Sequence, residues 1–284
     1  MRKLVCLTNS YHSPHLLNTL VDLSIPVHLG PGLSGENLSD LKIVSDADVP
    51  EYLSCGDLKL YISAEDSLGF IEEWSDCDLL KRNISFFKDK YEFRRSLKES
   101  YPDFYMERVA GKELSGLLVP EERELILKPV LGFHSLGIRR FVGREQLRQA
   151  AEEALREISG FGHVFNSSVL SDDVFIVEDF IEGEELACDA FYDANGVPAI
   201  NAIYRHAFTD RDDTRDLVYY TSVDVVAQYL EGMTELLESI AALTGIRNFP
   251  VHIEVRLSGQ QIIPIEVNPL RFGGFGLADL ALHA

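Results

Sequence analysis

The chain has 284 residues, and 46% of them are hydrophobic, which is enough to bury a substantial core in two or three packed units. Acidic residues outnumber basic residues by 46 to 26, so the formal net charge is -20. This charge would repel phosphate backbones and anionic lipids, which argues against nucleic acid and membranes as partners. Any site for an anionic nucleotide must therefore supply its own cations.

The cysteines and the amino terminus indicate the cellular setting. The four cysteines are scattered and form no CxxC pair: Cys6, Cys55, Cys77 and Cys188. The first apolar stretch breaks at residues 8–10, too soon for a signal peptide, and no apolar run has the length needed to span a bilayer. We therefore expect reduced thiols in a soluble, cytoplasmic protein.

The first 85 residues have the pattern of a small open α/β domain. Strands are predicted at residues 3–7, 25–29 and 58–62, and helices at residues 15–23 and 68–74. The strand-helix-strand order is Rossmann-like. No GxGxxG follows the first strand, so this domain is not predicted to bind a dinucleotide.

The middle of the chain begins with a basic, aromatic stretch that is predicted to be helical over residues 86–99. Further on, the pattern predicts a strand at residues 124–130, a glycine-containing loop at 132–137, an amphipathic helix at 144–158 and a strand at 174–177. The polar segment after the last strand, residues 178–183, is predicted to be a hinge.

Two strands and a long helix follow the hinge. The strands, at residues 186–192 and 197–204, are joined by Asn195-Gly196, which is a strong hairpin signal. Thr221 with Asp224 resembles a capping box, and an apolar periodicity then predicts a helix that extends to Ile240.

The last hairpin, from Val251 to Asn268, carries the most chemistry. Its first strand alternates, so that His252, Glu254 and Arg256 share a polar face, and its second strand places Glu266 and Asn268 on one face. Carboxylate and amide oxygens are hard ligands that suit Mg²⁺. An ordinary hairpin with a solvated polar face has the same pattern.

The register of this hairpin decides between a metal site and an ordinary hairpin. A two-residue turn at Ser258-Gly259 would put the two polar faces on opposite sides of the sheet, whereas a loop of three or five residues brings Glu254 opposite or diagonal to Glu266. Two adjacent carboxylates repel each other unless a cation lies between them. We therefore expect an odd-numbered loop and a metal site.

Four segments, in this order, resemble motifs of the ATP-grasp superfamily, which includes biotin carboxylase, D-alanine ligase and carbamoyl phosphate synthetase. They are DKYEF (89–93), LILKPVLGFHSLGI (125–138), VEDFIEGEE (177–185) and PVHIEVRLSGQQIIPIEVNPLRFGG (250–274). The chain departs from the family at Leu270, which separates Pro269 from Arg271 where many members read Glu-x-Asn-Pro-Arg.

The resemblance implies an α/β fold of the ATP-grasp type behind a Rossmann-like open-sheet domain. The amino-terminal domain would comprise residues 1–85 and the ATP-grasp domain residues 86–284. Within the latter, a lid subdomain would lie at about 125–180 and a metal-binding sheet at about 186–276.

The resemblance also implies ATP and Mg²⁺ as cofactors, with Mn²⁺ as a substitute, and it implies roles for individual residues. The metal ligands would be Glu254, Glu266 and Asn268. The nucleotide would be bound by Lys90, Lys128, Glu178, Phe180 and Glu185, with the backbone of Glu178 and Phe180 at the adenine. Arg256 or Arg271 would hold the substrate carboxylate or an acyl phosphate, and His134 and His252 are weaker candidates.

The activity that the resemblance implies is that of an ADP-forming carboxylate-amine ligase. Its partners would be a small-molecule carboxylate and an amine, and a homodimer stays open as the assembly. One alternative is a bicarbonate-activating enzyme similar to biotin carboxylase or carbamoyl phosphate synthetase. Another is a protein that binds ATP without catalysis. No motif in the chain identifies the acid or the amine.

Overall fold

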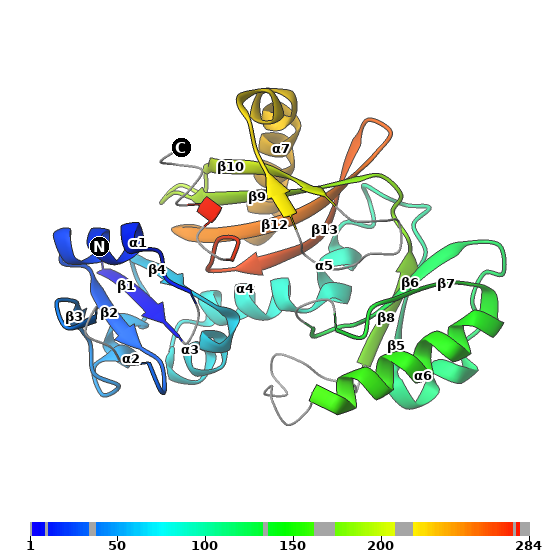
Figure 1. Ribbon diagram of the computed structural model, residues 1–284, viewed down its shortest axis with the longest axis horizontal. Helices are drawn as coiled ribbons and strands as arrows, with labels where there is room; N and C mark the ends of the chain where they lie inside the picture. The colour runs from blue at the N-terminus through cyan, green and yellow to red at the C-terminus, as the bar shows by residue number, and fades with distance from the viewer. Residues whose placement is uncertain are drawn as a thin grey trace.

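The computed structural model describes residues 2–8, 11–33, 38–132, 136–161, 174–207, 218–274 and 277–278. These residues form three sheets, each with its own helices (Figure 1). Among the helices described, none combines the length and the apolar character needed to cross a membrane.

The amino-terminal unit is built on a parallel sheet with the strand order β3-β2-β1-β4. Its strands are β1 (Arg2–Leu7), β2 (Pro26–Leu29), β3 (Lys42–Ile43) and β4 (Leu58–Ile62), and its helices are α1 (Pro14–Asp22), α2 (Val49–Tyr52), η2 (Glu65–Ser67) and α3 (Leu68–Trp74). Helix α1 begins where the sequence favours it, because the Ser13 side chain accepts a hydrogen bond from the amide of Leu16 and a proline follows Ser13. The parallel pairing confirms the predicted open sheet.

Two helices, α4 (Asp78–Lys88) and α5 (Lys90–Ser96), connect this unit to the rest of the chain. The prediction of one helical stretch over residues 86–99 is wrong. Asp89 has an extended ψ of 96°, and its carboxylate accepts hydrogen bonds from the amides of Tyr91 and Glu92, so that it caps α5. Helix α4 also continues across residue 85, where the sequence suggested a domain boundary.

The second unit is an antiparallel sheet with the order β5-β8-β6-β7, covered by one long helix. Its elements are β5 (Met106–Ala110), η3 (Gly111–Gly116), β6 (Glu124–Pro129), β7 (Arg139–Val142), α6 (Gly143–Phe161) and β8 (Val174–Asp179). The predicted helix and both predicted strands are present. The edge strands β5 and β7 were not predicted, because much of each strand is polar or half-exposed and gives no strong apolar pattern.

The third unit is a five-stranded antiparallel sheet with the order β11-β10-β9-β12-β13. Its elements are β9 (Glu184–Tyr192), β10 (Pro198–Ala207), β11 (Val218–Tyr220), α7 (Val223–Thr244), β12 (Phe249–Ser258) and β13 (Gln261–Pro269). The predicted capping box is wrong by one residue. Ser222 caps α7 by accepting from the amide of Val225, while the Thr221 hydroxyl donates to the carbonyl of Ile203.

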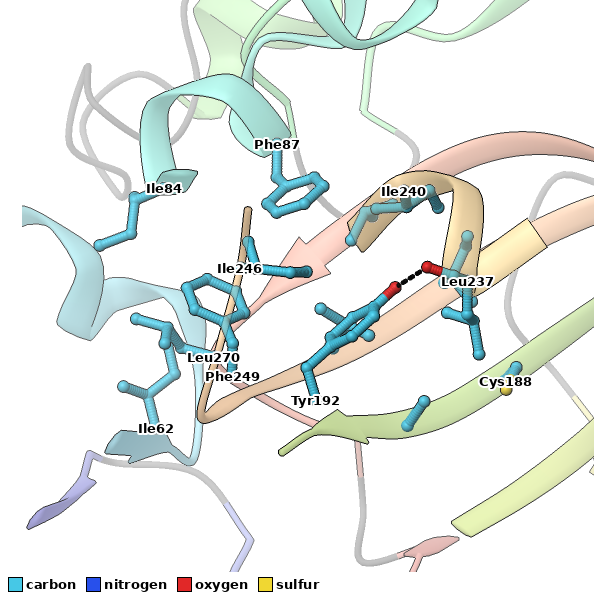
Figure 2. Close-up of a cluster of buried hydrophobic side chains, with 14 of the residues drawn as sticks. Ile62, Ile84, Phe87, Cys188, Tyr192, Leu237, Ile240, Ile246, Phe249 and Leu270 are labelled. Atoms are coloured by element: carbon cyan, nitrogen blue, oxygen red, sulfur yellow. Dashed lines mark hydrogen bonds between the residues drawn. The ribbon is translucent and has the colours of Figure 1, made fainter. Parts of the chain in front are cut away.

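One apolar face of the five-stranded sheet is buried by α7 and by α4 (Figure 2). Tyr192 of β9 is fully buried there, and its hydroxyl donates to the carbonyl of Leu237 in α7 at 2.9 Å. Phe87 of α4 and Phe249 of β12 belong to the same core, with ring centroids 6.0 Å apart. This core fixes the sheet against α4 and leaves the polar residues of β9 and β12 on the opposite face.

We predict that Gly183, which joins β8 to β9, tolerates no side chain. Its φ is +135°, and a Cβ atom there would lie 1.7 Å from the carbonyl oxygen of Leu257. Gly183→Ala should lower the free energy of unfolding by at least about 3 kcal/mol, measured by denaturant titration. Gly116→Ala is the matched control, because no atom lies within 4 Å of its added Cβ. Equal stability of the two variants would contradict the prediction.

Candidate active site

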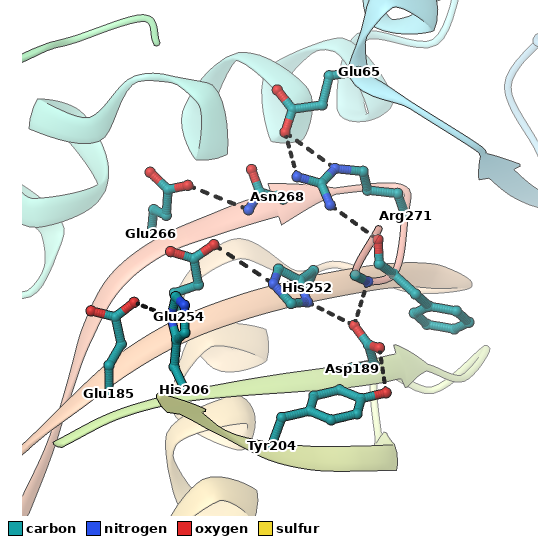
Figure 3. A network of polar contacts seen from close by, with 12 residues as sticks. Glu65, Glu185, Asp189, Tyr204, His206, His252, Glu254, Glu266, Asn268 and Arg271 are labelled. Carbon is teal, nitrogen blue, oxygen red and sulfur yellow. Dashed lines mark hydrogen bonds and ion pairs between the residues drawn. The ribbon is translucent and has the colours of Figure 1, made fainter. Parts of the chain in front are cut away.

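Strand β12 lies between β9 and β13, so the side chains on its polar face have neighbours from both strands (Figure 3). His252 lies opposite Asp189 of β9 and opposite Asn268 of β13. Glu254 lies opposite Glu266 of β13. The register therefore gathers three carboxylates, an amide and an imidazole on one face of the sheet.

A β-bulge produces this register. Strands β12 and β13 pair up to Ser258 and Gln261, so the turn has two residues and the predicted odd-numbered loop is wrong. The register then shifts next to Glu254, where Ile265 is the extra residue on β13. Because a bulge inserts one residue, it has the same effect on the polar faces as an odd-numbered loop. Glu254 and Glu266 therefore lie opposite each other as expected, but the cause is the bulge and not the length of the loop.

Glu254, Glu266 and Asn268 form an oxygen-rich set of side chains. The amide of Asn268 donates to Oε1 of Glu266 at 3.4 Å. Burial and the charge of Glu266 raise the pKa of the Glu254 carboxyl to about 7. Two facing carboxylates with an amide oxygen beside them suit Mg²⁺ or Mn²⁺. No group of three or more His, Cys, Asp or Glu side chains in the described part of the chain is spaced to hold a metal.

Lys90, the first residue of α5, brings a buried cation to these carboxylates. Its ammonium group lies 3.0 Å from Oε2 of Glu266 and donates to the carbonyl of Gly132 at 3.1 Å. Burial alone would lower the pKa of Lys90, but Glu266 outweighs it and raises the pKa. Residues 133–135 of the predicted loop, among them His134, lie outside the described residues.

Lys128, near the end of β6, is a second buried cation. Its ammonium group lies 2.6 Å from Oε1 of Glu178, and the guanidinium of Arg94 lies 2.8 Å from Oε2 of the same carboxylate. All three side chains are less than 5% exposed. Burial alone would raise the pKa of Glu178, but the two cations outweigh it and lower the pKa. The Glu178 side chain therefore binds the two cations that flank it.

Phe180 lies between two guanidinium groups at the start of the predicted hinge. The guanidinium carbon of Arg140 is 3.8 Å from the centre of the ring, and that of Arg256 is 4.7 Å from it. The Phe180 amide donates to the carbonyl of Glu124 at 3.0 Å, so this amide is not free to donate to an adenine ring.

Glu185 and Arg256 form a cross-strand ion pair. They are directly opposite in the β9–β12 ladder, and Nε and Nη2 of Arg256 donate to Oε2 of Glu185 at 3.0 and 2.8 Å. The other carboxylate oxygen of Glu185 lies 3.0 Å from Nδ1 of His206. Arg256 also donates to the carbonyl of Ile181 in the hinge, at 2.9 Å. The arginine thus connects the hinge to the polar face.

Leu270, which departs from the family pattern, turns the chain between the predicted metal ligands and Arg271. It has a left-handed φ of +64°, its side chain is buried, and its carbonyl accepts from the amide of Ile62 at 2.8 Å. Arg271 then reaches Glu65 of the amino-terminal unit, with Nη2 at 2.9 Å and Nε at 3.2 Å from Oε1. Glu65 also pairs with Lys88 of α4. Leu270 therefore directs the Arg271 side chain toward Glu65, where the amino-terminal unit meets the five-stranded sheet.

Asp189 joins the polar face to the loop that follows β13. It is fully buried, and its Oδ1 atom lies 2.8 Å from Nδ1 of His252 and accepts from the amide of Gly273 at 2.7 Å. Its Oδ2 atom accepts from the hydroxyl of Tyr204 at 3.1 Å. The other imidazole nitrogen of His252 faces Glu254 at 3.6 Å. Asp189 thus fixes the orientation of a histidine that touches a predicted metal ligand.

Sequence reasoning missed Asp189 and Glu65 for different reasons. Asp189 interrupts a buried apolar strand, and a lone carboxylate in such a strand is a signal that could have found it. Glu65 lies in a short 3₁₀ segment between β4 and α3, where no periodicity predicts burial. Its partners Lys88 and Arg271 are distant in sequence, so only the folded chain reveals the cluster.

A family profile described as "ATP-grasp domain" matches residues 121–279. The chain is similar to the solved structure of an L-amino acid ligase from Bacillus licheniformis, with a TM-score of 0.70 and 16% identity over 98% of this chain and 69% of that one. It is also similar to the VanG D-Ala:D-Ser ligase from Enterococcus faecalis, with a TM-score of 0.60 and 15% identity over 95% and 91% of the two chains. No curated protein matches the sequence. The profile and the shared folds confirm the predicted fold class.

We predict that Glu65 makes stability depend on pH in the acid range. Burial alone would raise its pKa, but Lys88 and Arg271 outweigh burial and lower the pKa from 4.5 to about 2. A depressed pKa stabilises the fold above the unfolded value, by about 3 kcal/mol here, and this contribution is lost as pH falls from about 4.5 to about 2. Glu65→Gln should therefore lower the free energy of unfolding at pH 7. Between about pH 4.5 and about pH 2, the stability of the variant should fall less steeply than that of the unchanged protein.

Urea unfolding at a series of pH values measures the effect. Glu73→Gln, a change at an exposed glutamate of α3, is the matched control and should keep the pH dependence of the unchanged protein. A Glu65→Gln protein with the same stability and the same acid profile would contradict the prediction.

Proposed function

The chain belongs to the ATP-grasp family, and from this premise we propose that it is an ATP-dependent ligase that joins a small-molecule carboxylate to an amine. The γ-phosphate of ATP would be transferred to the carboxylate, giving an acyl phosphate and ADP, and the amine would then displace phosphate. The observation that carries the proposal is the pairing of Glu254 with Glu266 beside the buried Lys90. We keep the division into an amino-terminal domain and an ATP-grasp domain as part of this proposal.

Glu254, Glu266 and Asn268 would hold the magnesium or manganese ion. Such an ion, when bound, neutralises the negative charge that develops on the phosphates during transfer. The protein contributes a rigid set of ligands, since Glu254 and Glu266 lie on two paired strands and His252 contacts Glu254 from the same face. A rigid set preserves the ligand geometry during the reaction.

Lys90 and Lys128 would contact the phosphates. A chain with a net charge of -20 must concentrate positive charge where an anionic nucleotide binds. Both ammonium groups are buried and paired with a carboxylate, Glu266 for Lys90 and Glu178 for Lys128. Each lysine is thus preorganised before a phosphate arrives, which reduces the entropy lost on binding.

The two arginines would have different tasks. Arg271 follows the metal ligands by three residues, and the charges of Glu254 and Glu266 act on it as well as that of Glu65. We therefore assign the substrate carboxylate or the acyl phosphate to Arg271. Arg256 contacts Glu185, Phe180 and the hinge, so it would position the residues that bind the adenosine.

A coupled measurement of ADP release tests the proposed reaction. Candidate acids are combined with candidate amines, and the product is identified by mass spectrometry. Release that requires both an acid and an amine supports the ligase. Release with bicarbonate and no amine would instead support a bicarbonate-activating enzyme, and tight ATP binding without turnover on any pair would support a protein that only binds ATP.

We predict that ATP binding depends on Lys128. Lys128→Ala removes a charge-assisted contact to the phosphates and should raise the Kd for Mg-ATP by about tenfold or more. Isothermal titration calorimetry measures the change. Lys112→Ala, at an exposed lysine of η3, is the matched control and should leave the Kd unchanged. An unchanged Kd in the Lys128 variant would remove this residue from the site.

We also predict that Glu266→Gln separates folding from catalysis. The substitution keeps the shape of the side chain and removes the charge that would bind the metal. The fold should survive, because the repulsion from Glu254 is relieved while Lys90 keeps its contact with the Gly132 carbonyl. ADP formation with a productive substrate pair should fall by several orders of magnitude.

Thermal unfolding and ADP formation are measured on the same preparation. Glu184→Gln, at an exposed carboxylate of the same sheet, should retain full turnover. A folded Glu266→Gln protein with nearly normal turnover would show that the hairpin has no catalytic role.

A further inference from the structure

Two thiols from separate segments meet on the surface of the amino-terminal unit. Cys55 lies in the connection between α2 and β4 and is exposed, and Cys77 directly precedes α4 and is half-buried. Both are free thiols, and a hydrogen bond joins Cys55 to Asp76, the residue next to Cys77 in the chain. Neither residue belongs to the site described above.

Hydrogen bonds hold the two segments in this arrangement. The hydroxyl of Ser75 donates to the carbonyl of Leu53 at 2.7 Å, and the amide of Cys55 donates to Oδ1 of Asp76 at 3.0 Å. The amide of Cys77 in turn donates to the Ser75 hydroxyl at 3.1 Å. These bonds tie the residues before each thiol to the other segment, so the approach of the thiols is built into the fold.

The other two cysteines provide a contrast within the same chain. Cys6 in β1 and Cys188 in β9 are both fully buried. Burial raises the pKa of Cys6 to about 12 and also raises that of Cys188. A buried, protonated thiol is a poor nucleophile and is closed to reagents in solution.

We propose that Cys55 and Cys77 form a reversible disulfide, made by a neutral peroxide and reduced by a small dithiol. In the first step one thiol attacks hydrogen peroxide, the O–O bond breaks, and a sulfenic acid and water are formed. In the second step the other thiol attacks that sulfur. The S–S bond forms, the S–O bond breaks, and the hydroxide leaves with the thiol proton as water. The two thiols together lose two electrons to one peroxide.

The charges around the pair favour a neutral oxidant. Asp57, Asp76 and Asp78 adjoin the two cysteines in sequence, while the only cation bound to this connection among the described contacts is Arg2, which donates to the Cys55 carbonyl at 2.9 Å. The hydrogen bond with Cys77 is the largest of the effects that raise the pKa of the Cys55 thiol, and the charge of Asp76 adds to them. An acidic surface repels anionic disulfides such as oxidised glutathione and attracts cationic ones such as cystamine.

Mass spectrometry of the full chain tests the proposal. After treatment with hydrogen peroxide and digestion without reductant, we expect a linked peptide that joins Cys55 to Cys77, a mass loss of about 2 Da, and reversal by dithiothreitol. Cystamine should oxidise the pair at least about tenfold faster than oxidised glutathione does. The oxidised chain should melt on the order of 5 °C higher, because the cross-link restricts the unfolded chain.

Serine variants provide the controls. In Cys55→Ser the partner thiol is missing, so dimedone should trap a sulfenic acid at Cys77 and no linked peptide should form. Cys6 and Cys188 should react only after denaturation. The proposal is overturned if the unchanged protein forms no linked peptide, whether or not Cys77 becomes dimedone-labelled or sulfinic, or if the buried cysteines react as fast as Cys55 and Cys77. Because these readouts do not involve ATP, their outcome is independent of the proposed ligase activity.

Discussion

The buried cations at the polar face of this acidic chain are each paired with a carboxylate. Lys128 and Arg94 share Glu178, and Lys90 pairs with Glu266, with every one of these groups withdrawn from bulk water except the half-buried Glu266. Each pair joins elements that are distant in sequence, so the same contacts that supply the counter-charges also fix α5 against β13 and β6 against β8. The cost of removing charge from water thus selects the arrangement of the polar face.

Much of this arrangement follows from local pattern. The alternation in β12 predicts which side chains share a face, and a face that carries Glu254 must be matched to the face of β13 that carries Glu266. The amphipathic helices α6 and α7 follow from apolar periodicity in the same way. These signals are strong because each depends on residues within one element.

The remainder depends on contacts between distant segments. The bulge at Ile265 satisfies a constraint that the sequence reveals, but its position is set by pairing with β12. The sequence did not predict the break at Asp89, because the segments on both sides favour helix. Only the Asp89 carboxylate, which caps α5, marks the boundary between the two helices. Glu65 acts through partners outside its own unit, and Asp189 through neighbouring strands and the loop after β13, and no periodicity can specify such contacts.

The turn at Leu270 has a consequence for how such chains could be recombined. The amide of Ile62 in the parallel sheet donates a hydrogen bond to the carbonyl of Leu270, and Arg271 contacts Glu65 nearby. The amino-terminal unit and the unit with the five-stranded sheet are therefore not independent modules that can be exchanged at a linker. A chimaera that receives a foreign amino-terminal unit would need an amide and a carboxylate at matching places, or its arginine would lose the counter-charge that orients it. Compatibility at this junction therefore limits which amino-terminal units such a chimaera can accept.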